Sequence, residues 1–188
     1  MIIKFKDFLL ENVEFKHTNP AKNQAVLFIG RFQPLTIGHV DLYNKSKAKI
    51  KNKKVIFAII RGKKTPKEKS PFPLELSKKI IKSCIPNSEV YEFNTGFIPD
   101  IIDELRGKDY EVELVFCGPD RYEGYKKQIE RYGDLLNSHP QIIVFPRDQK
   151  KVSGTKVREA LKNDDKDTFE KLTPKCEHKY YEELRKYI

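Results

Sequence analysis

The sequence predicts an α/β protein built on a doubly wound, five-stranded parallel sheet. Five short apolar segments alternate along the chain with longer stretches that have helical spacing. Residues 55–60 form a continuous apolar run, which is typical of a parallel strand covered on both faces. Strands that alternate with helices in this way predict ligand sites at the carboxyl ends of the strands.

Composition and charge set the class of the protein. The chain has 188 residues, 38% hydrophobic and 11% aromatic, which suits one domain with a substantial core. No apolar stretch approaches membrane-spanning length and charges interrupt the first apolar residues, so we expect neither a signal peptide nor a membrane partner. Cys84, Cys117 and Cys176 have no paired spacing, so we predict no disulfide framework, no zinc site and a reducing cytoplasm.

The first half of the chain predicts three strand-and-helix units. A short amphipathic helix is expected at residues 3–13, followed by a polar linker. The predicted strands and the helices that follow them are, in order, residues 25–29 and 38–50, residues 55–60 and 74–85, and residues 89–93 and 99–106.

The second half predicts two more strands and a helical C-terminus. Strands are expected at residues 113–117 and 141–145, with a polar helix at residues 121–132 between them. Helix is expected from Ser153 to the end, with breaks at Asn163 and Pro174. The predicted units are an N-terminal helix and linker at residues 1–23, the main domain at 24–163, and a C-terminal helical segment at 164–188 that packs on it.

The loop after the first strand has the composition of a phosphate site. Residues 30–39 read Gly-Arg-Phe-Gln-Pro-Leu-Thr-Ile-Gly-His. Gly30 permits a sharp turn, and Gly38 lets a ligand approach the free N–H groups at the start of a helix. His39 adds a side-chain donor at a helix end that favours an anion by about 0.3 to 1 kcal/mol. We therefore expect a phosphate to bind here.

A second candidate anion site opens the last predicted helix of the main domain. Residues 152–158 read Val-Ser-Gly-Thr-Lys-Val-Arg, with two hydroxyls, a glycine and two cations. Lys156 and Arg158 can hold phosphate oxygens at a helix N-terminus. An ordinary N-capped helix is the alternative, because serine and threonine are good caps.

These segments resemble the HxGH nucleotidyltransferases, the cytidylyltransferase-like superfamily, which implies a Rossmann-like, HUP-type fold. Thr36-Ile37-Gly38-His39 matches the [H/T]xGH signature, and Ser153 to Arg158 resembles the S-x-T-x-x-R segment. Residues 30–34 are most similar to archaeal-type nicotinamide mononucleotide (NMN) adenylyltransferases. A threonine at position 36 is familiar from phosphopantetheine adenylyltransferases.

The resemblance implies roles for individual residues. The catalytic residues would be Thr36, His39, Lys156 and Arg158. The nucleotide would be bound by Gly30, Arg31, Phe32, Gly38, Gly118, Asp120, Arg121, Ser153, Gly154 and Thr155. The acceptor would be bound by Phe72, Lys78, Asn94 and Phe97, although Phe97 can also be read as a core residue. The chain has Ser77 where the family usually has an arginine.

The implied reaction is the transfer of AMP from ATP to a small phosphorylated acceptor, with pyrophosphate as the leaving group. NMN is the expected acceptor, which would make the product NAD. Phosphopantetheine adenylyltransfer and CTP-dependent cytidylyltransfer are alternatives. Mg²⁺ would arrive with the triphosphate, because no residue cluster has metal-ligand spacing. Homo-oligomerisation is left open.

A non-catalytic reading comes from the N-terminus. Residues 5–11 are similar to N-terminal segments of tailed-phage proteins. This resemblance implies a packaged, nucleotide-binding phage component, or an enzyme that acts in the cytoplasm of the phage host.

The formal charge of +10 is concentrated in one part of the chain. Residues 45–82 contain fourteen Lys or Arg against two Glu. We interpret this block as solvated helix ends and loops, with steering of nucleotides as the alternative. The loop lacks the interleaved aromatic residues of nucleic-acid binders, which argues against a nucleic-acid partner.

Overall fold

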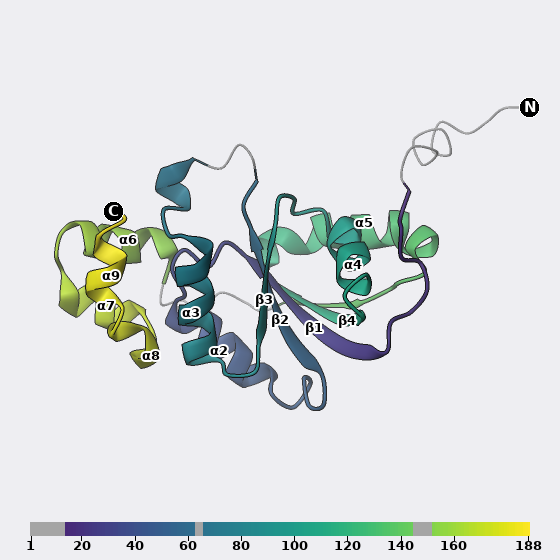
Figure 1. The fold of residues 1–188 in the computed structure, drawn as a ribbon, viewed down its shortest axis with the longest axis horizontal. Helices are drawn as coiled ribbons and strands as arrows, with labels where there is room; N and C mark the ends of the chain where they lie inside the picture. Colours follow the sequence, from purple (N-terminus) through teal and green to yellow (C-terminus); the bar gives the residue numbers. More distant parts are fainter. Residues whose placement is uncertain (1–13, 63–65, 145–151) are drawn as a thin grey trace, which may run out of the picture.

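The computed structural model describes residues 14–62, 66–144 and 152–188, which fold around one parallel sheet (Figure 1). The sheet has five strands in the order β3-β2-β1-β4-β5, and every pair of neighbours is parallel. The strands are β1 (Asn23–Gly30), β2 (Lys54–Ile60), β3 (Glu89–Phe93), β4 (Tyr110–Cys117) and β5 (Gln141–Val144). The predicted fold class is confirmed. The expected helix at residues 3–13 and residue 145 of the fifth strand lie outside the described residues.

The helices follow the strands as the sequence predicts. They are α2 (Ile37–Ser46), the 3₁₀ turn η1 (Lys67–Lys69), α3 (Leu74–Cys84), α4 (Ile98–Arg106), α5 (Pro119–Leu136), α6 (Gly154–Lys162), α7 (Lys166–Leu172), α8 (Lys175–His178) and α9 (Tyr181–Arg185). The breaks expected at Asn163 and Pro174 are present, because these residues lie between α6, α7 and α8.

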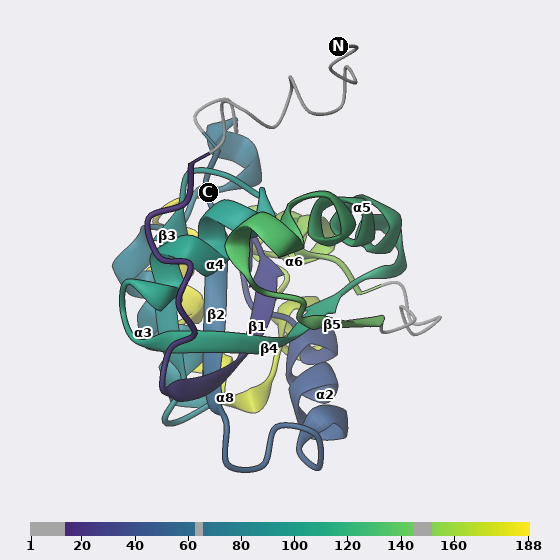
Figure 2. The same cartoon turned by 90° about the vertical axis from the view of Figure 1, so that its right-hand side faces the viewer.

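Helices cover both faces of the sheet. Helices α4 and α5 lie together on one face, in front of the sheet in Figure 2, while α2 and α3 lie on the other. On the α2 and α3 side, Phe28 of the central strand stacks on Phe57 at 5.1 Å and on Phe116 at 4.6 Å between ring centroids. The burial of both faces explains the continuous apolar composition of the central strands.

Several boundaries differ from those predicted, and a contact distant in sequence accounts for the start of β1. Strand β1 begins at Asn23, whose side-chain amide donates to the Asp109 carbonyl at 3.1 Å and to its carboxylate at 2.9 Å. Helix α5 runs from Pro119 to Leu136, longer than the predicted 121–132, and ends where Asn137 takes a left-handed φ of 50°. Helix α2 ends at Ser46 rather than near residue 50.

The prediction of unpaired cysteines is wrong for two of the three. Cys84 at the end of α3 and Cys176 in α8 form a disulfide across 92 residues of sequence. The sequence spacing conceals this pair because only the packing of α8 against α3 brings the two sulfurs together. Cys117 is buried and free, and burial raises the pKa of its thiol to about 11. The inference of a reducing compartment from unpaired cysteines therefore loses its basis.

Arg106 fastens the end of α4 to three other parts of the chain. Its buried guanidinium makes a bidentate ion pair with Glu111 of β4, with distances of 2.8 and 2.7 Å. It also donates to the carbonyls of Leu136 and Asn137 at the end of α5 and to that of Thr18 before β1. A charge with this many partners is tolerated in the interior only while all of them stay in place.

We expect Arg106→Met to lower the free energy of unfolding by about 3–5 kcal/mol, because it leaves the Glu111 carboxylate without its partner. Urea denaturation measures the change. Lys108→Met is the matched control, since the side chain of Lys108 is 39% exposed and its ion pair with Glu104 is a surface pair worth about 1 kcal/mol or less. Equal losses in the two variants would contradict a structural role for the Arg106 network.

Candidate active site

The loop that follows β1 ends in a helix cap that fixes His39. Thr36 is buried and forms the N-cap of α2. Its backbone N–H donates to Nδ1 of His39 at 2.9 Å, and its hydroxyl oxygen lies 2.9 Å from the same nitrogen. Because Nδ1 accepts the backbone hydrogen bond, a neutral His39 carries its proton on Nε2. The loop therefore presents an N–H donor beside the free N–H groups of the helix terminus.

Phe32 supports the imidazole from the side. Its ring is buried and packs edge-on against His39, with 5.0 Å between ring centroids. Its backbone has a φ of 47°. A Cβ added to Gly30 would lie 3.0 Å from this ring, so a larger residue there would push the ring out of its place. Burial lowers the pKa of His39 to about 4. His39 is therefore neutral near pH 7.

The second predicted anion segment lies directly against this loop. Ser153 caps α6, and its hydroxyl accepts from the N–H of Lys156 at 3.3 Å. Nη1 of Arg158 donates to the Gln33 carbonyl at 2.6 Å, and Nη2 donates to the Thr155 hydroxyl at 3.2 Å. Two segments about 115 residues apart thus meet at the carboxyl end of β1.

The same contact explains the glycine at the start of α6. A Cβ added to Gly154 would lie 2.8 Å from the Gln33 carbonyl oxygen, closer than real Cβ atoms approach a backbone atom. Only a glycine lets the first turn of α6 lie this close to the loop after β1.

The charges of Arg31 and Arg158 interact at this junction. Burial and the charge of Arg31 lower the pKa of Arg158, and the charge of Glu159 partly offsets them. A bound anion would relieve the repulsion between the two arginines. The junction therefore favours a ligand with several negative charges.

The next predicted nucleotide residues follow β4, the neighbour of β1. Gly118 is the N-cap of α5, and Asp120 lies in its first turn with Arg121 beside it at 3.8 Å. The strand order reverses between β1 and β4, since β2 and β3 lie on one side of β1 and β5 lies on the other. Such a switch point is where open α/β sheets bind ligands.

The predicted acceptor residues follow β2 and β3, on the other side of β1. The Phe72 side chain is 1% exposed and belongs to the core, so it offers an acceptor little surface. Lys78 pairs with Glu75 on its own helix at 2.8 Å. Asn94 is exposed at the end of β3, and Phe97 caps α4 with its ring packed edge-on against Tyr132 at 5.1 Å. Their roles in binding stay predictions.

The cytidylyltransferase-like family model matches residues 27–160, which span both anion segments and more than half of the chain. The chain belongs to the cytidylyltransferase-like family. The matched range begins inside β1 and ends inside α6, so it contains the whole junction described above.

Individual relatives within this family are adenylyltransferases. The chain is 33% identical to a phosphopantetheine adenylyltransferase of Tolumonas auensis over 160 residues, covering 80% of this chain and 89% of the relative. It is 29% identical to the phosphopantetheine adenylyltransferase of Bordetella avium over 146 residues, covering 72% of this chain and 78% of the relative.

A solved structure shares the fold. The bifunctional NMN adenylyltransferase/ADP ribose pyrophosphatase of Francisella tularensis superposes with a TM-score of 0.57 and 23% identity. The match covers 88% of this chain and 50% of the Francisella chain, so the present chain spans about half the length of that protein.

The sequence by itself assigned no role to Gln33 or Arg61, which both contact the segment before α3. Gln33 lies inside the predicted loop but is buried, where it contacts the segment before α3. Arg61 directly follows β2 and donates to the Phe72 carbonyl. A polar residue enclosed by apolar neighbours was the available signal for Gln33, whereas Arg61 is hidden among the many cations of the basic block.

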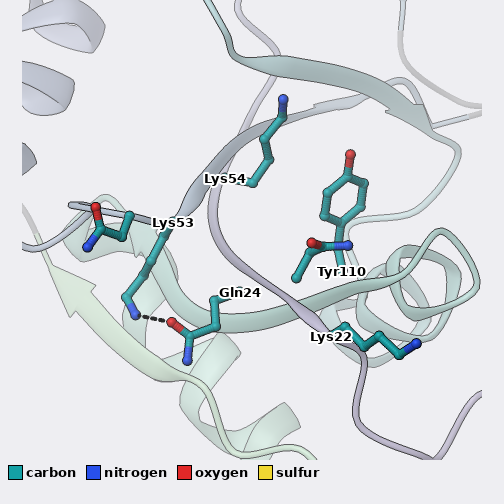
Figure 3. Close-up of a pocket in the computed structure, with 7 residues that line it drawn as sticks. Lys22, Gln24, Lys53, Lys54 and Tyr110 are labelled. Atoms are coloured by element: carbon teal, nitrogen blue, oxygen red, sulfur yellow. Dashed lines mark hydrogen bonds between the residues drawn. The ribbon is translucent and has the colours of Figure 1, made fainter.

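A pocket of about 620 Å³ lies at the opposite edge of the sheet (Figure 3). Its lining comes from the amino ends of β1, β2 and β4, and includes Lys22, Gln24 and Tyr110. Lys53 bonds to Gln24 at 3.0 Å and pairs with Glu113, and Lys54 pairs with Glu89 at 3.0 Å. These two lysines of the basic block are thus paired with carboxylates at the start of β2.

Within residues 14–62, 66–144 and 152–188, no group of three or more His, Cys, Asp or Glu could hold a metal ion. None of the helices in these ranges is long and apolar enough to cross a membrane.

We expect Gly154→Ala to lower the free energy of unfolding by about 1–3 kcal/mol, because the new methyl group collides with the Gln33 backbone. Gly124→Ala is the matched control. Gly124 is also a helix glycine, but a Cβ there meets nothing within 4 Å, so alanine should stabilise the protein by about 0.5–1 kcal/mol. Chemical denaturation compares the two. If both substitutions stabilise the protein, the close approach of α6 to the loop after β1 is contradicted.

Proposed function

We propose that this protein transfers AMP from MgATP to a phosphate group of a small acceptor and releases pyrophosphate. The observation that supports this best is the contact between the two anion segments, in which Arg158 donates to the Gln33 carbonyl three residues before Thr36. A triphosphate bound at this junction can contact both helix termini at once. The adenylyl group is chosen over cytidylyl because the relatives reported above are adenylyltransferases.

The mechanism needs positioning and charge neutralisation rather than an enzyme nucleophile. The acceptor phosphate attacks the α-phosphate in line, the bond to the β-phosphate oxygen breaks, and Mg²⁺-pyrophosphate leaves. The Nε2–H of His39 donates to the α-phosphate as charge builds there. Lys156, Arg158 and the hydroxyls of Ser153 and Thr155 bind the leaving phosphates.

Two acceptors have support. Residues 30–34 favour NMN, which would make the product NAD. The two phosphopantetheine adenylyltransferase relatives favour phosphopantetheine. An enzyme that consumes ATP acts where ATP is made, so we propose the cytoplasm, or the host cytoplasm for a phage protein, as its compartment.

A panel of substrates tests the proposal. Pyrophosphate release is measured with ATP or CTP, each combined with NMN or 4′-phosphopantetheine, and the adenylylated product is identified by mass spectrometry. We expect release with ATP and one of the two acceptors. Release with CTP alone would assign a cytidylyltransferase. No release in any combination would favour a nucleotide-binding or packaged protein without turnover.

We predict that His39→Ala lowers kcat by about 100- to 1,000-fold, because the variant lacks a donor at the α-phosphate. The circular dichroism spectrum should stay close to that of the wild type, because the substitution removes one hydrogen-bond partner of the Thr36 backbone and leaves the sheet and its covering helices intact. His139→Ala is the control, because His139 is 58% exposed and pairs with Asp134 far from the loop. Turnover at the wild-type rate in His39→Ala would overturn its assigned role.

We predict that His39 titrates with a pKa of about 4, well below the ordinary histidine value of 6.5. NMR titration of the four histidines measures this, and the signal missing in His39→Ala identifies the residue. Because the folded pKa is below the unfolded one, the unfolded chain binds more protons between pH 4 and 6.5. His39 therefore costs stability as the pH falls through this range. A His39 pKa near 6.5 would contradict a desolvated imidazole that is neutral near pH 7.

A further inference from the structure

The Gln33 side chain is a buried amide between two loops of the site. Gln33 is 3% exposed. Its Oε1 accepts from the backbone N–H of Phe72 at 2.9 Å, and its Nε2 donates to the Phe72 carbonyl at 3.2 Å. Nε2 also donates to the Ser77 hydroxyl at 3.2 Å. One side chain thus satisfies both backbone groups of Phe72, as a neighbouring strand would.

Phe72 is held from a second direction as well. A guanidinium nitrogen of Arg61, at the end of β2, donates to the same Phe72 carbonyl. Arg61 is anchored in turn by an ion pair with Glu92 of β3 at 3.3 Å. The Phe72 ring is buried in the core, so its peptide cannot move without breaking several contacts.

The main chain of Gln33 contacts helix α6 instead. Its carbonyl accepts from Arg158 of α6 at 2.6 Å. Gln33 therefore contacts the triphosphate-binding helix with its backbone and the segment before α3 with its side chain. A substitution at this position removes the side-chain contact with Phe72 and keeps the backbone contact with Arg158.

The strand order places the segment before α3 on the β2 side of β1, away from β4 and β5. A nucleotide at the junction of β1, α6 and the end of β4 occupies the switch point. The loops after β2 and β3 lie on the other side of β1, the side from which the proposed acceptor phosphate would attack. In-line attack requires that this side be fixed relative to the α-phosphate to within a fraction of an ångström.

We infer that Gln33 is a positioning residue that sets the acceptor segment, residues 70–77, against the nucleotide loop. This inference rests on the proposed transferase function. Gln33 itself touches neither substrate; it acts through Phe72 and Ser77. The chain uses Ser77, a position that the resemblance assigns to an acceptor-binding arginine, as a hydrogen-bond partner for this amide.

The test compares Gln33→Leu with Gln141→Leu, the same substitution at an exposed glutamine of β5. Steady-state kinetics use ATP and whichever of NMN or 4′-phosphopantetheine gives release with the wild type. We expect the acceptor KM of Gln33→Leu to rise about tenfold or more, since three hydrogen bonds are lost. The dissociation constant for ATP should change by less than about twofold. Gln141→Leu should match the wild type in both.

This split separates positioning from a general loss of structure. In a partly unfolded enzyme fewer molecules are active, so the apparent kcat falls. The acceptor KM and the dissociation constant for ATP then stay unchanged. An unchanged acceptor KM, or equal changes for acceptor and ATP, would overturn the inference. Failure of the wild type to release pyrophosphate would instead overturn the proposed function, and the inference with it.

Ser77→Ala keeps the test decisive if Gln33→Leu does not fold. It removes one acceptor of the Gln33 amide, and we expect the acceptor KM to rise about threefold with ATP binding unchanged. Hydrogen exchange adds a readout that needs no substrate. In Gln33→Leu the Phe72 amide should lose at least about tenfold of its protection, while the Val157 amide, bonded to Ser153 at 3.2 Å, keeps its own. Wild-type acceptor KM in Ser77→Ala, or full protection of Phe72, would reject the role.

Discussion

The contact between the first turn of α6 and the loop after β1 is the constraint on which the candidate site depends. Gly154 allows the approach because it has no Cβ, and the hydrogen bond from Arg158 to the Gln33 carbonyl fixes it. This contact sets the N-terminus of α6 against the loop that leads into the N-terminus of α2. The first N–H groups of a helix have no intrahelical acceptor, and a guanidinium has more donors than the two that Arg158 uses on Gln33 and Thr155. A polyphosphate can accept from both sets of donors.

The rest of the fold holds the two partners of this contact in place. The central strand β1 carries the loop, and its stacked Phe28 anchors it in the core. The C-terminal helices pack on α3 and α6 from outside. The Cys84–Cys176 disulfide joins α8 to α3, and Lys79 of α3 pairs with Glu183 at 3.3 Å and lies over the Tyr180 ring at 5.2 Å. The last part of the chain thus supports the helices on both sides of the site.

The positive charge at the candidate site comes from a few residues and does not follow from the net charge of the whole chain. The formal charge of +10 comes largely from lysines, and those around the amino ends of the strands are paired with Glu89 and Glu113. At the junction, by contrast, burial and then the charge of Arg31 lower the pKa of Arg158. A partly buried arginine such as Arg158 interacts with an anion more strongly than a solvated lysine does, because water and salt screen the lysine.

The sequence by itself determined the sheet, the order of its elements and the two anion segments, because apolar periodicity and glycine-rich helix starts are local signals. Only the tertiary structure decided which residues meet. It set the start of β1 through Asp109, paired Cys84 with Cys176, and enclosed Gln33 between Phe72 and Ser77. These contacts join residues at least 39 positions apart, and their existence depends on the packing of helices against a common sheet. Local sequence patterns carry no information about such distances, so they could locate the parts of the site but not the residue that connects them.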